Sequence, residues 1–424
     1  MPETRFRVRL QTWSSILRQR IREKSWFMDL GLFLLMMLGV ARALIGQNTK
    51  AVAIFSQIHR TTRSGWMRRL AETYVVRNIG VFPADLLAPI KDEIKTQFGK
   101  RLLVLKAPAG AGEKGVLLAM FNETIRLLRP SLNLEKLLQD YTLVLEPSWS
   151  GYCHPGILGL SAYNEEIFVL ASEDNDFAFL DRFRSNLIPI RLGSCDWVDP
   201  RLAEPYLKSP KEFDIVMNST WASWKRHYVL FHMLAKARRR YRVVLIGVAW
   251  EGESRQDIET LADFYGVYAQ ITIREQVSYD EVMRITCSSR VSILLSLKEG
   301  SNRAVAESIF CNVPVVVLSN HVGGIRKNVV PQTGVLAEER TLETSIAELL
   351  RGSLRPRDWA LKNISCFESA AKLNAILREH SLRRGRPWTK DVACRANSPE
   401  SSYVYQSDAE GLRIWNESLG KYLT

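Results

Sequence analysis

Short apolar segments alternate with helical patterns along most of this chain of 424 residues. The segments are rich in valine, isoleucine and leucine and apolar on both faces, which is typical of parallel strands covered by helices on each side. We expect strands at residues 101–107, 141–147, 166–172, 187–193, 213–219, 241–249, 269–275, 291–297 and 313–319. We expect helices at residues 115–128, 224–239, 254–265, 278–287, 303–311 and 341–351. The alternation predicts an α/β protein with right-handed βαβ units and doubly wound sheets.

A polar segment that contains proline, residues 196–212, interrupts this series. We interpret it as the link between two Rossmann-like domains, at residues 76–205 and 206–355. Residues 1–75 are a separate helical extension, and residues 356–424 form C-terminal helices that can cross back to the first of the two domains. In such a protein we expect the ligand in the cleft between the domains, at the carboxyl ends of the strands.

The positive charge of the chain is concentrated at its amino end. The net charge is +13, and residues 1–76 hold 13 Lys and Arg against 4 Asp and Glu, which leaves +9 in this segment. A basic end on a nearly neutral body predicts an anionic partner, either membrane headgroups or nucleic acid. Nothing here resembles a helix-turn-helix, an RNA-recognition motif or a zinc finger, so we expect no nucleic-acid partner.

The same end of the chain carries apolar side chains at helical spacing. Arginines separate Phe6, Leu10, Trp13, Leu17 and Ile21. This pattern predicts a basic amphipathic helix that can lie in the headgroup layer of a membrane. The apolar run that follows, residues 26–46, has an uncharged core of only 12 residues, whereas a spanning helix needs about 20.

Three interpretations of the apolar run stay open: a buried or interfacial helical hairpin, a marginal membrane anchor, and a signal peptide. The charged leader of 24 residues argues against the signal peptide. We expect a cytoplasmic protein whose residues 1–46 make peripheral contact with the cytoplasmic face of a membrane. The six cysteines show no CxxC spacing, so we interpret them as free thiols in a reducing compartment.

A glycine-rich segment between residues 101 and 117, RLLVLKAPAGAGEKGVL, has the outline of a phosphate-binding loop. It is not a Walker loop, because Gly112 is followed by Glu113 and the lysine by glycine, so the G-K pair and the magnesium-binding hydroxyl are missing. We expect the turn to follow the first strand of the first domain. The turn contains Gly110 and Gly112.

The most informative stretch is residues 296–336, where an apolar strand ends at Leu297 and a helix begins near Asn302 or Arg303. A helix amino end leaves N–H groups unpaired and carries partial positive charge. The residues before the helix are small, so an anion such as a diphosphate can approach closely. They are Gly300, Ser301 and Asn302.

Two glutamates flank this helix start. Glu299 stands at the end of the strand and projects into the cleft, where it can hydrogen-bond sugar hydroxyls. Glu307 comes eight residues later, about two helical turns on, and can accept hydrogen bonds from a ribose in the same cleft.

With its serine, two glutamates and following apolar strand, the stretch resembles a known family: the retaining glycosyltransferases of the GT-B fold, glycosyltransferase family 4 (glycosyl transferases group 1). The matching residues are Ser296, Glu299, Gly300, Asn302, Glu307, Pro314, Val315, Val316 and Gly334. The resemblance covers residues 213–350. It implies two Rossmann-like domains that face a cleft, with Glu299 on the donor sugar and Glu307 on the nucleotide ribose.

The resemblance suggests further site residues. Lys225 and Arg226 occupy the place of a basic pair that neutralises the donor diphosphate, and such cations stabilise the departing nucleoside diphosphate. Arg274 and Glu275 end a strand where the family builds its nucleobase slot. His154, in the first domain, matches a histidine that often contacts the donor sugar. Gly323 and Gly324 resemble a loop over the donor, whereas we expect His321 to be only a loop histidine. The resemblance also implies that Gly110 and Gly112 are supporting residues, in a glycine-rich loop that lines the donor or acceptor side of the cleft.

Other candidate motifs carry less weight. Asp174, Asn175 and Asp176 form a D-x-D pattern, which holds a metal in a different glycosyltransferase fold. We interpret these residues as a helix cap and turn, and expect no metal site. The chain contains no G-x-S-x-G elbow, no H-E-x-x-H and no Cys/His ligand cluster.

The resemblance implies an enzyme that moves a sugar from a nucleoside diphosphate sugar to an acceptor hydroxyl, with retention at the anomeric carbon. The acceptor is then a glycan or a lipid-linked molecule in polysaccharide, lipopolysaccharide or glycolipid synthesis, and no metal or other cofactor is expected. One alternative is a nucleotide-sugar epimerase of the same fold, whose acid and base carboxylates we cannot identify in the first domain. Another is a catalytically inactive, membrane-associated scaffold.

Overall fold

The chain folds into two compact units, each of which draws on separate parts of the sequence. Unit 1 consists of Met1–Glu23, Cys195–Glu368 and Asn397–Pro399, and unit 2 of Lys24–Ser194, Ser369–Ala396 and Glu400–Thr424. The computed structural model describes residues 2–23, 25–62, 64–78, 101–110, 112–148, 151–183 and 185–424, and only the helical backbone of residues 2–9 and 25–27. The units divide between Ser194 and Cys195, earlier in the chain than the predicted boundary.

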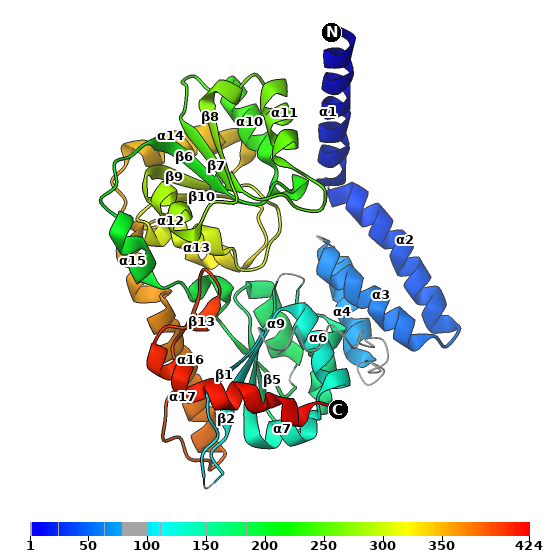
Figure 1. The fold of residues 1–424 in the computed structure, drawn as a ribbon. Coiled ribbons are helices and arrows are strands. Elements are labelled where there is room, and N and C mark those ends of the chain that lie inside the picture. The colour runs from blue at the N-terminus through cyan, green and yellow to red at the C-terminus, as the bar shows by residue number, and fades with distance from the viewer. Residues whose placement is uncertain are drawn as a thin grey trace. The chain divides into compact units, whose positions relative to one another are not determined.

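Unit 1 is built on a parallel sheet of six strands (Figure 1). The strands are β6 (Phe213–Asn218), β7 (Val243–Gly247), β8 (Ile271–Glu275), β9 (Ser289–Leu294), β10 (Val315–Leu318) and β11 (Gly334–Ala337). Their order in the sheet is β11-β10-β9-β6-β7-β8. The chain therefore runs outward from β6 in one direction and from β9 in the other, so the sheet is doubly wound as predicted. β11 was not among the predicted strands; it has only four residues, GVLA, and most of them are half-buried.

Helices cover both faces of the unit 1 sheet. They are α10 (His227–Lys236), α11 (Arg255–Phe264), α12 (Tyr279–Cys287), α13 (Arg303–Phe310), α14 (Leu342–Arg351) and α15 (Pro356–Asn363). Buried side chains of α10, α11 and α14 form one core with the sheet, and those of α12 and α13 pack in clusters with its other side chains. The strands are apolar on both faces because both faces are covered.

The first helix, α1 (Pro2–Glu23), belongs to unit 1. Ile16 packs against the unit 1 core, and Gln19 Nε2 donates to Ser223 O at 2.6 Å. The predicted amphipathic stripe is not the side that packs, since its described members are 36% to 56% exposed: Leu10, Trp13, Leu17 and Ile21. The side chain of Phe6 lies outside the described residues.

Unit 2 contains a five-stranded sheet in the order β1-β2-β3-β4-β5. The strands are β1 (Leu102–Lys106), β2 (Gly115–Met120), β3 (Tyr141–Glu146), β4 (Ile167–Leu170) and β5 (Leu187–Ile190). β1 and β2 are antiparallel, and β2 to β5 are parallel. The parallel strands follow their sequence order, so this sheet has no switch of direction and differs from the doubly wound order expected for both domains.

The prediction of a helix over residues 115–128 is wrong in its first half, because residues 115–120 form β2 and the helix starts at Asn122. The helices of unit 2 lie before the sheet, between its parallel strands and after it in sequence. They are α2 (Ser25–Leu44), α3 (Asn48–Thr61), α4 (Gly65–Arg77), α6 (Asn122–Ser131), α7 (Leu134–Asp140), α8 (Pro155–Leu158), α9 (Asp174–Phe183), α16 (Cys366–Arg383) and α17 (Gln406–Glu417).

The C-terminal segment closes the open edge of the unit 2 sheet. α17 packs on β1, where Asn416 Oδ1 accepts a hydrogen bond from Val104 N at 2.9 Å. Tyr403 OH donates to Val104 O, and Ala393 N donates to Leu105 O. These bonds satisfy backbone groups that an edge strand would otherwise leave unpaired.

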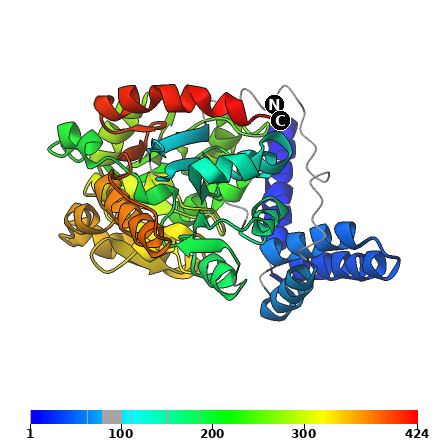
Figure 2. The same ribbon diagram turned by 90° about the horizontal axis from the view of Figure 1, so that it is seen from below.

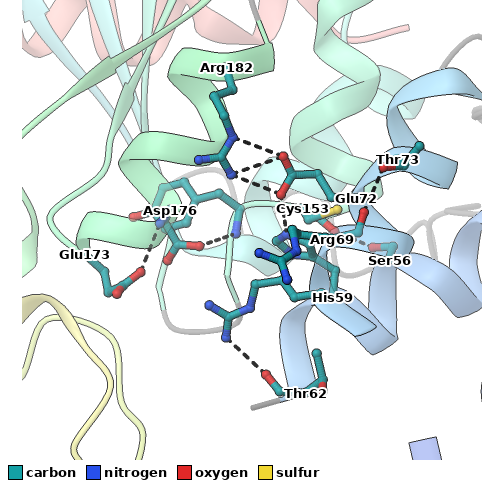
Figure 3. A network of polar contacts seen from close by, with 12 residues as sticks. Ser56, His59, Thr62, Arg69, Glu72, Thr73, Cys153, Glu173, Asp176 and Arg182 are labelled. Carbon is teal, nitrogen blue, oxygen red and sulfur yellow. Dashed lines mark hydrogen bonds and ion pairs between the residues drawn. The ribbon is translucent and has the colours of Figure 1, made fainter. Parts of the chain in front are cut away.

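The helices α2, α3 and α4 lie side by side, with α3 packed against both of the others (Figures 1 and 2). Figure 3 shows the polar contacts that hold α3 and α4 to the rest of unit 2. Glu72 accepts hydrogen bonds from Arg182 and lies 3.5 Å from His59 Nε2, and the hydroxyl of Ser56 donates to Cys153 O. These helices are therefore part of unit 2, not a separate extension with α1 over residues 1–75.

Candidate active site

The candidate site of unit 1 lies where the winding of its sheet changes direction. β6 and β9 are parallel neighbours, with Ile215 opposite Val291, and the chain leaves them toward opposite sides. The loops after these two strands therefore start next to each other at the carboxyl edge. In open α/β sheets, ligands bind in the crevice at this switch point.

The loop after β9 carries Glu299, and the loop after β6 carries Lys225. Their charged groups meet, with Lys225 Nζ 2.8 Å from Glu299 Oε1, and the two side chains are only 9% and 10% exposed. Ser296 Oγ donates to Glu299 Oε1 at 2.5 Å, and Asn302 Nδ2 donates to Oε2 at 2.7 Å. Lys225 Nζ also lies 4.2 Å from the ring centroid of Trp224. Both carboxylate oxygens and the ammonium are thus held in place by charge-assisted hydrogen bonds and a cation–π contact.

Asn302 links this cluster to the start of α13. Its Oδ1 accepts from Val305 N at 2.9 Å, which makes it the N-cap of the helix. The same side chain holds Glu299 through Nδ2, so capping the helix also orients the carboxylate. Gly300 and Ser301 form the half-buried turn between strand and helix. The structure therefore brings five predicted residues together: Lys225, Glu299, Gly300, Ser301 and Asn302.

A second loop, residues 321–324, packs directly on this turn. Val322 N donates to Leu297 O at 2.8 Å, Glu299 N donates to Val322 O at 3.0 Å, and Gly324 N donates to Gly300 O at 3.0 Å. A Cβ on Gly323 would lie 2.4 Å from Glu299 O and 2.8 Å from Gly300 O. Glycine is required here because no side chain fits between the two loops.

His321 is buried beside Glu299, so the expectation of an ordinary loop histidine missed it. Its Nδ1 lies 2.8 Å from Ser296 O, so Nδ1 carries the proton and Nε2 is left as an acceptor. Among the described residues, Nε2 has no hydrogen-bond partner. Burial lowers the pKa of His321, which keeps the ring neutral. Its place two residues before the Gly323-Gly324 pair was the available signal in the sequence.

The side chain of Arg226, the neighbour of Lys225, points away from Glu299. The backbone of Arg226 is left-handed, with φ at 64°, and its side chain is buried away from Glu299. Its guanidinium bonds Leu295 O at 3.1 Å and forms ion pairs with Glu23 at 3.0 Å and Glu339 at 2.5 Å. The geometry does not support the predicted diphosphate contact, because these partners already occupy the guanidinium. Arg226 instead fastens α1 to unit 1.

Glu307 also differs from its predicted role. It lies on α13 and is 3% exposed. Its Oε1 is within 3.0 Å of Tyr279 OH, 2.9 Å of Ser398 Oγ and 3.1 Å of Arg303 Nε. Burial and the charge of Glu307 raise the pKa of Tyr279, which therefore stays a hydrogen-bond donor. All three contacts fall on one oxygen of the carboxylate, Oε1.

β8 ends at Arg274 and Glu275, which the resemblance places at the nucleobase slot. Of these two residues, only Glu275 contacts a loop of the candidate site. Glu275, the last residue of β8, accepts a hydrogen bond from Trp221 Nε1 at 2.7 Å, which ties it to the loop after β6. Arg274 is exposed on the edge strand. Glu275 thus helps shape the carboxyl edge, and Arg274 borders it.

His154 is a predicted site residue of unit 2. It caps α8, where its Nδ1 accepts from Gly156 N at 3.0 Å, so its proton lies on Nε2. Burial lowers its pKa to about 4, and the nearby charges of Arg60 and Arg126 act in the same direction. The neutral imidazole of His154 lies in the segment after the carboxyl end of β3, as the sequence predicted.

Gly110 and Gly112 lie in the hairpin turn between β1 and β2, at the amino end of β2. The predicted strand–turn–helix geometry is wrong, since a strand follows the turn. The loop thus offers no helix amino end for a phosphate and stands opposite the carboxyl edge of the parallel strands. Glu113 bonds Lys106 and Thr389, and although burial opposes ionisation, these bonds lower the pKa of Glu113 to about 2.

The D-x-D pattern opens α9. Asp174 forms an ion pair with Arg191 at 2.6 Å, and Asp176 Oδ1 accepts from Tyr152 N at 3.1 Å. Within the part of the chain that the structure describes, no group of three His, Cys, Asp or Glu side chains could hold a metal ion. Asp176 therefore attaches a loop and Asp174 forms a surface ion pair. The side chain that caps α9 is Glu173, whose Oε2 accepts from Asp176 N at 2.9 Å, one residue before the pattern that was interpreted as the cap.

The candidate site lies in the part of the chain that resembles a known sequence family. Residues 199–363 match the family described as Glycosyl transferases group 1. This match spans less than half of the chain and contains Lys225, Glu299 and the loop at residues 321–324. A comparison with curated proteins gave no match.

Several solved structures are distantly similar in fold. Sucrose-phosphate synthase from Thermosynechococcus elongatus has 17% identity and a TM-score of 0.48, covering 63% of this chain and 74% of its own. Anabaena HepE in complex with UDP and glucose has 14% identity and a TM-score of 0.49, covering 74% and 90%. A glycosyltransferase from Rickettsia africae has 14% identity and a TM-score of 0.43, covering 56% and 76%.

Proposed function

We propose that the protein is a glycosyltransferase that moves a sugar from a nucleoside diphosphate sugar to an acceptor hydroxyl, with retention at the anomeric carbon. The observation that carries this proposal is the Lys225–Glu299 pair at the switch point of unit 1, inside the segment that matches the glycosyl transferases group 1 family. A cation and a carboxylate held at this edge suit a ligand that joins a diphosphate to a sugar.

The two charged groups take different parts in the proposed reaction. As the bond to the leaving diphosphate breaks, its negative charge grows, and the ammonium of Lys225 stabilises that charge. Glu299 accepts hydrogen bonds from donor hydroxyls, and its held geometry fixes the sugar relative to the phosphate. Lys225 is already paired with Glu299. When the donor binds, the ammonium has to contact both Glu299 and the phosphate. The departing phosphate takes the proton of the acceptor hydroxyl, so no separate base is assigned.

The acceptor is proposed to be a glycan or a lipid-linked molecule of polysaccharide, lipopolysaccharide or glycolipid synthesis, presented at the cytoplasmic face of a membrane. The +9 charge of the first 76 residues supports a membrane partner. Among the described residues no single helix is both long and apolar enough to cross a membrane, although α1 and α2 together satisfy length and composition.

One observation favours the inactive-scaffold alternative. Glu307 is expected to hold the ribose, but one oxygen of its carboxylate, Oε1, is already bound by Tyr279, Ser398 and Arg303. If this arrangement persists when donor is present, the site lacks one of the two glutamate contacts that the resemblance implies. Activity measurements separate the two functions.

The test is release of nucleoside diphosphate from a panel of uridine, guanosine, adenosine and thymidine diphosphate sugars. At least one donor should be turned over, and Glu299→Gln should slow it by about 10- to 100-fold, the value of a lost charged hydrogen bond. Proton NMR recorded as the sugar is released, before it mutarotates, should show the anomer of the donor. EDTA should change nothing, since no metal is expected.

Turnover of no donor by the full chain would leave the scaffold alternative standing. Turnover by Glu299→Gln at the wild-type rate would contradict the site. An inverted anomer would contradict retention alone.

A further inference from the structure

One side of α2 is fixed within unit 2. Leu32 and Met36 are buried against α3, and a Cβ on Gly39 would lie only 3.0 Å from a methyl carbon of Ile54. Phe55 of α3 packs in the same core. One side of α2 is therefore packed closely against α3. The opposite side faces away from α3.

The opposite side of α2 is apolar and exposed. Its large side chains are 39% to 82% exposed: Leu30, Phe33, Leu34, Met37, Leu38, Val40 and Leu44. At about 100° per residue they span roughly half of the helix circumference. Residues 30–41 include no charged side chain at all. A helix on the surface of a soluble domain normally turns its polar side outward, so this continuous patch marks an interaction surface.

Polar and basic groups stand at the ends of this apolar face. Asp29, before it, accepts a hydrogen bond from Thr62 Oγ1 at 3.2 Å. Arg42, near its end, donates to Gln47 Oε1 at 2.5 Å, and the exposed Lys50 follows at the start of α3. The cations therefore lie at the margin of the apolar face, where anionic headgroups would lie if the face entered a bilayer.

We propose that α2 inserts its outward half into an anionic lipid surface and lies in the plane of that surface. The uncharged part of α2, residues 30–41, is about 18 Å long and is bounded by Asp29 and Arg42. It is shorter than the roughly 30 Å hydrocarbon core, so it is suited to lying in the interface rather than crossing it. A face as wide as half a circumference matches lipid better than the narrower seam of a helix pair. This inference deepens the membrane contact proposed above and is independent of transferase activity.

The test is flotation of the full-length protein with vesicles of phosphatidylcholine and phosphatidylglycerol. The wild type should float, and the double variant Leu34→Glu/Leu38→Glu should lose at least about tenfold in partitioning, because two charges cannot enter the acyl region. Arg42→Gln/Lys50→Gln should weaken binding to these vesicles but not to pure phosphatidylcholine vesicles. The matched control is Ile414→Glu, at a 68% exposed apolar residue of α17 in the same unit, which should float as the wild type does.

Both substituted leucines point outward, so the variants should keep the wild-type circular dichroism spectrum. Equal flotation of Leu34→Glu/Leu38→Glu and the wild type would overturn the proposal, and would leave α1 as the lipid-binding segment. A wild type that does not float, but forms a dimer that this variant loses, would overturn it in favour of a second copy of the chain. Neither result touches the transferase proposal, whose failure shows in donor turnover instead.

Discussion

At the residue scale, the neighbouring side chains of Lys225 and Arg226, in the loop after β6, point in different directions. Lys225 meets Glu299 at the switch point, and Arg226, one residue on, turns into the protein toward Glu23 and Glu339. The difference comes from the left-handed backbone of Arg226. The sequence showed two cations and could not assign them, because a single positive φ decides which of them faces the site.

Gly323→Ala tests the packing of the two loops beside Glu299. The new methyl group would overlap Glu299 O and Gly300 O, so we expect a loss of about 1–3 kcal/mol in the free energy of unfolding and weaker donor binding. Urea unfolding measures the first. Gly352→Ala in the same unit is the matched control, since its Cβ would meet its nearest atoms at 3.6 Å. Equal stability of the two variants would contradict the loop contact.

At the element scale, α1 is attached to unit 1 by polar contacts at its end. Glu23 binds Arg226 and accepts from Tyr228 OH, and Gln19 bonds Ser223 O. The amphipathic stripe that dominates the sequence pattern is exposed instead. Apolar spacing predicted the helix correctly, but it could not tell which side would pack, because the other side uses a few specific bonds.

Glu23→Ala should release α1. Arg226 would keep Glu339 but lose its second carboxylate, and an incompletely paired buried cation destabilises, here by about 1–3 kcal/mol. We expect faster tryptic cleavage after Arg18 and Arg20, and a lower melting temperature. Trp13→Ala, on the exposed stripe of the same helix, should leave both unchanged. A Glu23→Ala protein that resists trypsin as the wild type does would show that α1 is held by other contacts.

At the scale of the whole molecule, the alternation of strands and helices was predictable because parallel strands buried on both faces are apolar throughout. β2 was the main exception. Its run, GVLLAM, leads directly into the helix at Asn122, and a fully buried strand has no period of two to separate it from a helix.

The structure brings predicted residues together where their positions depend on local sequence. Glu299, Asn302 and Lys225 follow from strand ends and a helix cap. The hydrogen bond from Ser398 to Glu307 was not predictable, because Ser398 lies 91 residues further along the chain. Contacts of that separation depend on the path of the C-terminal segment, for which the sequence carries no local signal.

Unfolding of unit 1 should depend on acid through His227. Burial, followed by the charge of Lys225, lowers the pKa of His227 to about 3. Between pH about 6.5 and about 3 the unfolded chain takes up a proton that the folded unit does not. The free energy of unfolding therefore decreases as the pH is lowered, by up to about 1.4 kcal/mol per pH unit. Urea midpoints at several pH values should show this slope, and His227→Gln should reduce it. An unchanged slope in the variant would assign the acid sensitivity to other groups.

The switch point of unit 1 is proposed to bind a nucleoside diphosphate through Lys225. Isothermal titration calorimetry with uridine, guanosine and adenosine diphosphates measures this binding. We predict that at least one of them binds the wild type and that Lys225→Met weakens this binding at least tenfold, since a charged hydrogen bond contributes about 1.5–3 kcal/mol. Lys208→Met, at an exposed lysine of the same unit, should bind as the wild type does. Equal affinity of Lys225→Met and the wild type, or no binding of any diphosphate, would contradict the claim.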